Sequence, residues 1–185
     1  MNFLVFIIIL AVIIVWVVGI YNGLVRRRKQ ADNGWSQIDV QLKRRHDLIP
    51  NLVETVKGYA KHEREVLENV TAARSHAIEA KTQGVGAQIE AETALGGALR
   101  GLMVAVEAYP DLKASKNFLA LHEELTSTEN KIGFARQHYN DVATDYNTAI
   151  AIFPNTIIAG MFAFKTCELW QIADAAERAV PQVSF

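Results

Sequence analysis

Histidines beside carboxylates are the first place to look for chemistry, because helical proteins often hold metal ions through Glu-x-x-His pairs. The chain has five histidines, and none has a glutamate three positions before it. Those earlier positions hold Lys43, Tyr59, Ala73, Leu119 and Ala135, ahead of His46, His62, His76, His122 and His138. His122-Glu123-Glu124 begins like a zinc-protease motif but lacks the second histidine. We therefore predict no metal site and no cofactor.

The sequence also lacks nucleotide-binding motifs and the signature of a catalytic nucleophile. Gly84-Val85-Gly86 is missing the third glycine of a dinucleotide loop, and no Gly-Lys-Ser/Thr sequence occurs. Cys167 is the one cysteine, and in an apolar, aromatic-rich stretch a cysteine usually packs rather than reacts. We predict that the protein is not an enzyme. An enzyme or sensor with a small-molecule site stays as an alternative, and it would need buried, convergent titratable groups.

The polar cluster Lys43-Arg44-Arg45-His46-Asp47 lies just before Pro50-Asn51. Lys43 and Arg44 are interpreted as solvated residues with weak pairs four apart on a helix. Asp47 and Asn51 lie beside apolar residues. They either belong to a network that fixes helix register or a subunit contact, or are solvated too.

A second polar row carries Thr126, Gly133, Asn140 and Asn147, which are seven residues apart. In a coiled coil, such a row beside the apolar seam can set register and partner choice. We therefore assign Asn140 and Asn147 to the same structural or assembly network, with a tolerated flank as the alternative.

The elements that position these residues are predicted to be helices. The clearest runs from about Ala114 to Phe153, where apolar residues alternate at spacings of three and four over five heptads. Its stripe comprises Phe118, Leu121, Leu125, Thr128, Ile132, Ala135, Tyr139, Val142, Tyr146, Ala149 and Phe153. Such a stripe needs neighbours, and three other amphipathic segments are available. The predicted fold is all-α: an N-terminal transmembrane helix followed by an up-and-down four-helix bundle with long helices.

The remaining bundle segments are predicted as follows. The first carries Trp35 to Ile49, and Pro50 either kinks it or starts a second helix. The second runs from Leu52 to near Gly84, and the third from about Ala87 to Ala108. In the third, Gly96, Gly97 and Gly101 are expected to permit close approach of a neighbouring backbone.

The membrane prediction rests on residues 3–20, which carry no charge. As a helix they span roughly 27 Å, close to the hydrocarbon thickness of a bilayer. The predicted anchor residues are Phe3, Leu4, Val5, Phe6, Ile7, Ile8, Ile9, Leu10, Val12, Ile13, Ile14, Val15, Trp16, Val17, Val18 and Ile20. The predicted headgroup contacts are Tyr21, Arg26, Arg27, Arg28 and Lys29.

The basic cluster follows the span, so the positive-inside rule places the N-terminus outside and the helical domain in the cytoplasm. We expect the span to stay in the mature protein, because no basic region precedes it and no small-residue cleavage site follows Gly19. The predicted domains are the anchor at 1–22, the bundle at 23–153 and an apolar extension at 154–185. That extension, with its tail Val180–Phe185, is expected to pack on the bundle, the membrane surface or a neighbouring subunit.

The net charge and the cysteine count restrict the classes of partner and the compartment that the sequence suits. The net charge is −1, which gives no basic field for nucleic acid. One cysteine cannot form an internal disulfide, which suits a reducing compartment. The expected partners are the lipid bilayer and further copies of the chain as a homo-oligomer, with another membrane protein as an alternative partner.

The chain resembles the LemA family of bacterial membrane-anchored proteins almost end to end. The matching stretches are Tyr21-Asn22-x-Leu24-Val25, Trp35 to Val53, Glu124-Leu125, Glu129 to Ile132, Ala135 to Val142, Tyr146-Asn147, Phe153-Pro154-Asn155 and Pro181-x-Val183-x-Phe185. Two departures are Gly34, where alanine is common, and Ala163, where glycine is usual. The resemblance implies one N-terminal membrane helix, a helical bundle and no established reaction, so it transfers no catalytic residues.

Three functions follow as hypotheses. The first is a non-enzymatic membrane scaffold, self-assembling at the bacterial inner membrane. The second is an adaptor for another membrane protein, such as a protease or transporter, which a stoichiometric second chain in native membranes would favour. The third is the small-molecule enzyme or sensor already described.

Overall fold

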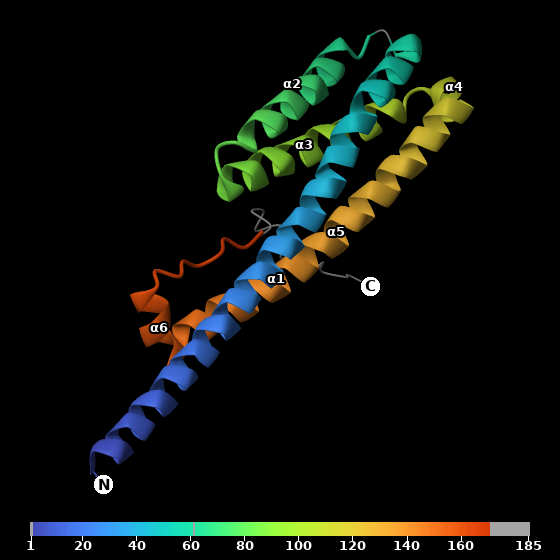
Figure 1. Cartoon of the computed structure of the whole chain (residues 1–185). Helices are drawn as coiled ribbons and strands as arrows, with labels where there is room; N and C mark the ends of the chain where they lie inside the picture. Colours follow the sequence, from blue (N-terminus) through green and yellow to red (C-terminus); the bar gives the residue numbers. More distant parts are fainter. Residues whose placement is uncertain (1, 61, 171–185) are drawn as a thin grey trace, which may run out of the picture. The chain divides into compact units, whose positions relative to one another are not determined.

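The computed structural model describes residues 2–60 and 62–170, where every regular element is an α-helix (Figure 1). The elements are α1 (Asn2–Tyr59), α2 (Arg64–Ala80), α3 (Val85–Val106), α4 (Pro110–Lys113), α5 (Lys116–Ala151) and α6 (Asn155–Met161). The all-helical prediction is confirmed for the described residues. The chain divides into two compact units: unit 1 comprises Met1–Ala31 with Tyr139–Phe185, and unit 2 comprises Asp32–His138.

Unit 2 forms around an apolar core to which α1, α2, α3, α4 and α5 all contribute. The core residues are Ile49, Leu52, Val56, Ala60, Leu67, Val70, Ala77, Ala80, Ala91, Leu95, Leu99, Leu102, Val106, Leu112, Phe118 and Leu125. Helix α2 packs against α3, and the two lie side by side in Figure 1. The turn between them contains Gly84 at φ +114°, a backbone conformation that glycine adopts without strain.

The predicted second helix from Leu52 to near Gly84 is wrong. Helix α1 continues through Pro50 to Tyr59, and a new helix begins only at Arg64. Continuing α1 keeps Ile49, Leu52 and Val56 on the face that enters the core. This burial outweighs the proline's missing backbone donor.

The predicted long helix from Ala114 to Phe153 corresponds to α5, with an end two residues earlier. Phe153, the last residue of the predicted stripe, is not part of the buried face of α5, since it is 78% exposed. A residue before proline is disfavoured in the helical region, so α5 ends at Ala151, before Phe153-Pro154. The close approach expected at Gly96, Gly97 and Gly101 is also absent among the described residues, because a Cβ there would meet no atom within 4 Å.

Unit 1 has its own small core at the C-terminal end of α5. It contains Leu24, Tyr146, Ala149, Ile150 and Ala159, with Ile20, Phe164 and Cys167 packed against it. An extended segment, residues 164–170, follows α6. Residues 171–185, with the predicted apolar tail Val180–Phe185, lie outside the described residues.

Candidate functional site

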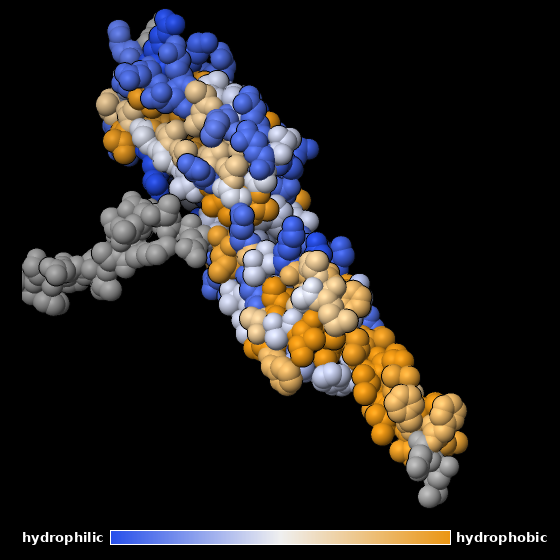
Figure 2. Space-filling view, turned by 90° about the vertical axis from the view of Figure 1, so that its left-hand side faces the viewer, coloured by the Kyte–Doolittle hydropathy of each residue, from blue (hydrophilic) through white to orange (hydrophobic). Residues whose placement is uncertain are grey.

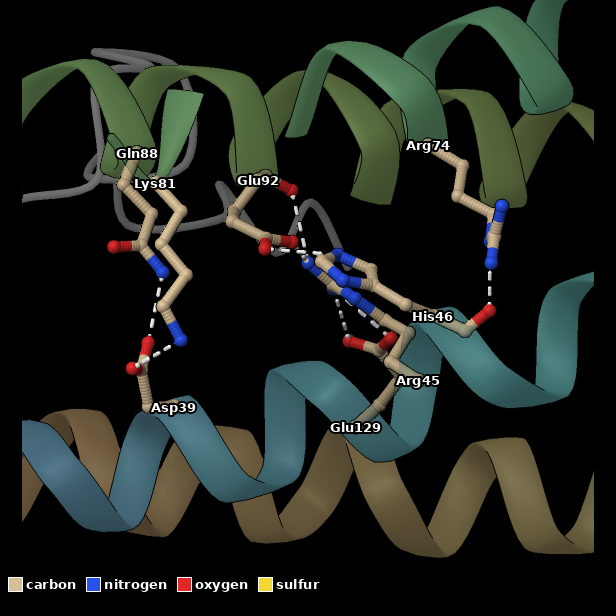
Figure 3. Close-up of polar contacts among 8 residues, drawn as sticks. All are labelled: Asp39, Arg45, His46, Arg74, Lys81, Gln88, Glu92 and Glu129. Carbon is tan, nitrogen blue, oxygen red and sulfur yellow. Dashed lines mark hydrogen bonds and ion pairs between the residues drawn. The ribbon is translucent and has the colours of Figure 1, made fainter. Parts of the chain in front are cut away.

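The best-defined polar site in unit 2 is the guanidinium of Arg45, whose side chain is 4% exposed. It pairs with the carboxylate of Glu92 on α3, whose side chain is fully buried, and donates to the Glu92 carbonyl oxygen at 3.2 Å (Figure 3). Its other terminal nitrogen donates to both carboxylate oxygens of Glu129 on α5, at 3.0 and 3.2 Å. One side chain of α1 therefore ties α1, α3 and α5 together.

His46 extends this arrangement toward α2. Its Nε2 lies 2.9 Å from Glu92 Oε1, although the two atoms do not meet hydrogen-bond geometry. The His46 carbonyl accepts a 2.7 Å hydrogen bond from Arg74 Nε on α2. Burial acts to raise the pKa of Glu92, but the His46 contact and the positive charge of Arg45 outweigh it, and the pKa is lowered. We conclude that Glu92 is a carboxylate at neutral pH.

A third set of contacts lies six residues before Arg45 on α1. Asp39 accepts a 2.9 Å hydrogen bond from Gln88 Nε2 and lies 2.7 Å from Lys81 Nζ. Figure 3 shows how these groups converge on α1 from α2 and α3, beside the Arg45 contacts. We call the whole set the polar network: Asp39, Arg45, His46, Arg74, Lys81, Gln88, Glu92 and Glu129.

A groove of about 510 Å³ lies over the polar network, lined by residues of α1, α2 and α3. Its wall carries charges of both signs, with Lys43, Arg74 and Lys81 against Asp39 and Asp47. The hydroxyl of Ser36, which lines the groove, donates to the backbone oxygen of Asp32 at 2.9 Å and is not activated by a base. Within residues 2–60 and 62–170, no three His, Cys, Asp or Glu side chains are grouped to hold a metal. The polar network connects helices, and no nucleophile–base pair can be assigned in it.

The four residues predicted to form an assembly network separate into two pairs. Asp47 and Asn51 are exposed on α1, and neither belongs to the polar network. Asn140 and Asn147, in unit 1, each hold one residue of the C-terminal segment by its backbone. Asn147 donates to the Cys167 carbonyl at 2.9 Å and accepts from its N–H at 2.8 Å.

Asn140 makes the same pair of hydrogen bonds with Trp170, both at 2.9 Å. The hydroxyl groups of Tyr139 and Tyr146 donate to the carbonyls of Glu168 and Lys165. The two asparagines of the row therefore bind an irregular stretch of the same chain, where a coiled-coil register contact or a tolerated flank was predicted. Thr126, another member of the row, donates its hydroxyl to the His122 carbonyl instead. Cys167, held by Asn147, packs its side chain on the unit 1 core.

Sequence reasoning missed Arg45, Glu92 and Glu129, although the sequence carries a signal for the first two. Arg45 lies three or four residues from the neighbouring buried apolar residues of α1, and Glu92 occupies the equivalent kind of position on α3. The buried positions are Ile38, Leu42, Arg45, Ile49 and Leu52 on α1 and Gln88, Glu92, Leu95, Leu99 and Leu102 on α3. A charged residue within an apolar stripe, with an opposite charge in another stripe, predicts a buried ion pair.

The predicted anchor residues all lie on α1, and none of the most apolar window is buried (Figure 2, orange end). That window has a mean hydropathy of 3.4, so the helix is long and apolar enough to cross a membrane. Of the predicted headgroup residues, Arg26, Arg28 and Lys29 are exposed. Arg27 pairs with Asp145 of α5, and Tyr21 packs its ring on Phe162 and Phe164.

Comparison with known proteins relates this helical chain to a family. The LemA family model matches residues 34–185. The chain belongs to the LemA family. This match begins beyond the apolar window, so the family model does not cover the predicted anchor.

Two curated relatives extend the LemA similarity over most of the chain. Protein LemA of Metamycoplasma hominis is 27% identical over 157 residues, which cover 85% of this chain and 71% of that protein. Magnetosome protein MamQ of Magnetospirillum gryphiswaldense is 26% identical over 189 residues, which cover 88% of this chain and 70% of that protein.

Proposed function

We propose that this LemA-family protein is a non-enzymatic scaffold, anchored in the bacterial inner membrane by the first part of α1 and self-assembling there. The single observation that carries the proposal is the apolar window of α1, none of which is buried among residues 2–60 and 62–170. A helix apolar on all faces is stable in lipid and costly in water. The basic residues after it favour a cytoplasmic position for unit 2, which we interpret as the predicted four-helix bundle.

The polar network supports a non-enzymatic role. Its best-buried charges, Arg45 and Glu92, are used in contacts between helices. Catalytic groups need an accessible partner and a place for substrate, whereas these two side chains face each other inside unit 2. A rigid helical body on a membrane anchor suits a scaffold.

Self-assembly is supported by Gly19, at the end of the apolar run, and Gly23, one helical turn beyond it, which have the small-xxx-small spacing of membrane helix dimers. A Cβ on either glycine would meet no atom of the described residues within 4 Å, so packing within that part of the chain does not require glycine at these positions. Glycine also weakens a helix by about 1 kcal/mol relative to alanine. We propose that α1 of a second copy packs against this site.

Anchoring is tested by carbonate extraction and vesicle flotation of the full-length protein. The protein should stay with the membrane after the carbonate wash and float with the lipid. Release into the wash would overturn the anchor.

Self-assembly is tested with Gly19→Leu/Gly23→Leu in detergent, with the mass of the particle measured over a concentration series. The double variant should shift to the monomer, with Ala11→Leu as a matched control that keeps the wild-type mass. A wild-type protein that is monomeric throughout would contradict self-assembly and leave the anchor proposal standing.

An adaptor function is a second candidate because a groove of about 720 Å³ lies between α1 and α2. Val53, Ala60 and Leu67 form its apolar part, and Lys57 and Arg64 are charged residues beside them. A partner chain bound there should copurify from native membranes in stoichiometric amount and be lost in Ala72→Arg, which fills the groove. The control is Ala120→Arg, at an exposed position on α5. A second chain that persists in Ala72→Arg would exclude the groove as its site.

A further inference from the structure

Unit 1 contains a second apolar feature, outside the predicted span. From Tyr146 to Phe164, nineteen residues carry no charge, and Asp145 and Lys165 bound this stretch. It forms the end of α5, the turn at Pro154 and α6. Part of it is buried in unit 1, namely Tyr146, Ala149, Ile150, Ile158 and Ala159.

The outward half of this stretch is apolar as well. Phe153 is 78% exposed and Met161 is 71% exposed, and Ile152, Ile157 and Phe162 are each more than half exposed. We call these five residues the corner patch. Exposed large apolar side chains that lie close together along the chain mark a candidate interaction site.

The position of the corner patch relative to α1 is fixed by contacts within unit 1. Tyr21 directly follows Ile20, the last residue of the apolar run. The Tyr21 ring lies 4.8 Å from the ring of Phe162 and 5.7 Å from that of Phe164, centroid to centroid. Ile20 packs on the same small core as Ala159 of α6. The Phe162 end of the patch is therefore level with the end of the apolar run.

The charges beside the patch suit a lipid surface. Lys165 is exposed directly after it, and Arg26 and Arg28 are exposed on the next turns of α1. The nearest acidic residue before the patch, Asp145, is paired with Arg27. Cations near the surface of an anionic bilayer are attracted to it, so Lys165, Arg26 and Arg28 favour contact with lipid headgroups. Glu168, three residues after Lys165, is an exposed acidic residue that opposes this attraction.

From these observations we infer that the corner patch is embedded in the membrane interface, and that the α5–α6 corner is a second, monotopic contact of unit 1 with the bilayer. This inference rests on the proposed anchoring of α1. If α1 crosses the bilayer up to Ile20, the patch reaches the boundary between headgroups and acyl chains, where apolar faces of interfacial helices lie about 5–10 Å deep. A second protein covering the patch would itself have to lie at the level of the lipid, so lipid is the occupant that the geometry favours.

The test places an environment-sensitive fluorophore at single cysteines of the full-length chain, in a Cys167→Ala background. Phe153→Cys and Met161→Cys report on the corner patch. Val104→Cys in unit 2 is the matched control, since Val104 is 73% exposed and apolar but far from α6 in sequence. The protein is reconstituted in phosphatidylcholine–phosphatidylglycerol vesicles that contain a quencher on a shallow or a deep acyl carbon.

The emission maxima of the labels at 153 and 161 should shift to the blue, and their emission intensity should fall with the shallow quencher. The label at 104 should show neither change. Equal behaviour of 153, 161 and 104 would overturn the inference. A blue shift at 153 and 161 without lipid quenching would also overturn it, because a second protein molecule would then cover the patch.

A further label at Val12→Cys separates this inference from the anchor itself. Position 12 should be quenched by the deep quencher. If it is quenched while 153 and 161 are not, only the interfacial corner is wrong. If position 12 is not quenched either, the proposed anchoring fails with it.

Discussion

Arg45 shows how one charged side chain can connect three helices after leaving water. Its partner Glu92 has a side chain with no exposed surface, so removing the arginine leaves a buried charge without its main counter-charge. We predict that Arg45→Met lowers the free energy of unfolding by about 3–5 kcal/mol, and that Arg45→Met/Glu92→Leu recovers most of the loss. Urea unfolding of the full chain in detergent, followed by circular dichroism, measures both.

Arg44, the neighbouring residue, provides the control for this prediction. It pairs with Glu124 at 2.6 Å, but both side chains are more than 40% exposed. An exposed pair contributes at most about 1 kcal/mol, so Arg44→Met should change little. Equal losses for Arg44→Met and Arg45→Met would mean that burial does not set the strength of the Arg45 contact.

The lowered pKa of Glu92 predicts a pH dependence of stability. Burial opposes the charged form, but His46 and Arg45, which face Glu92 from α1, overcome it. A carboxyl group with a folded-state pKa below its ordinary value of 4.5 contributes stability above that pH, and the contribution is lost as the pH falls through the lower folded-state pKa. The difference in unfolding free energy between wild type and Glu92→Gln should therefore shrink below pH 4.5. A constant difference down to pH 3 would contradict this.

Ala163 carries backbone strain that a single substitution should relieve. It lies at φ +53° directly after the C-cap of α6, where Ala163 N–H donates to Gly160 and Phe164 N–H donates to Ala159. This hydrogen-bond pattern is a Schellman motif, in which glycine is the usual residue at that position. Ala163→Gly should stabilise unit 1 by about 1 kcal/mol, because an L-residue in the left-handed region costs about 1–2 kcal/mol. Thermal unfolding of the full chain measures the effect, and a lower midpoint would contradict it.

At the scale of elements, the two asparagines of α5 define how the C-terminal segment is held. Asn140 and Asn147 are seven residues apart, about 10.5 Å along a helix, and they hold Trp170 and Cys167, three residues or about 10 Å apart in an extended chain. The match of these two rises lets two residues on one helix face bind two residues, three apart, of a segment without regular secondary structure. The contacts are to backbone groups, so they fix position more than side-chain identity.

We predict that Asn140→Ala/Asn147→Ala releases this segment while α5 stays helical. Hydrogen exchange measured by mass spectrometry should show faster exchange in the peptide that contains Cys167 and Trp170. The backbone N–H groups of these two residues donate hydrogen bonds to the asparagine side chains. The control is Asn130→Ala, at an exposed position on the same helix. Unchanged protection in the double variant would mean that Tyr139 and Tyr146 alone hold the segment.

Helix type and the long stripe of α5 could be predicted from sequence, because apolar spacing reports which face of a helix is buried. The break after Tyr59 could not, since Pro50 is the stronger local signal for a helix boundary and the core at Leu52 and Val56 overrides it. The roles of Asn140 and Asn147 could not be predicted either. A polar row at heptad spacing is equally compatible with a coiled-coil partner and with an extended strand, and only the fold of residues 164–170 distinguishes them.

At the scale of the whole molecule, the charges around the span predict its orientation. Arg26, Arg27, Arg28 and Lys29 follow the apolar run of α1. Moving four cationic groups across an energised membrane is unfavourable, so we expect them to be retained on the cytoplasmic side. The N-terminus should then face outward and unit 2 should face the cytoplasm.

Single cysteines in a Cys167→Ala background test this orientation with a membrane-impermeant thiol reagent on intact spheroplasts. Asn2→Cys should react before lysis, whereas Leu119→Cys in unit 2, at an exposed position, should react only after it. Replacing the four basic residues by glutamine removes the retention signal, so a fraction of the chains should then label at position 119 without lysis. If Leu119→Cys already reacts on intact cells with all four cations in place, the orientation is the opposite one. In that case unit 2 would meet its partners outside the cytoplasm.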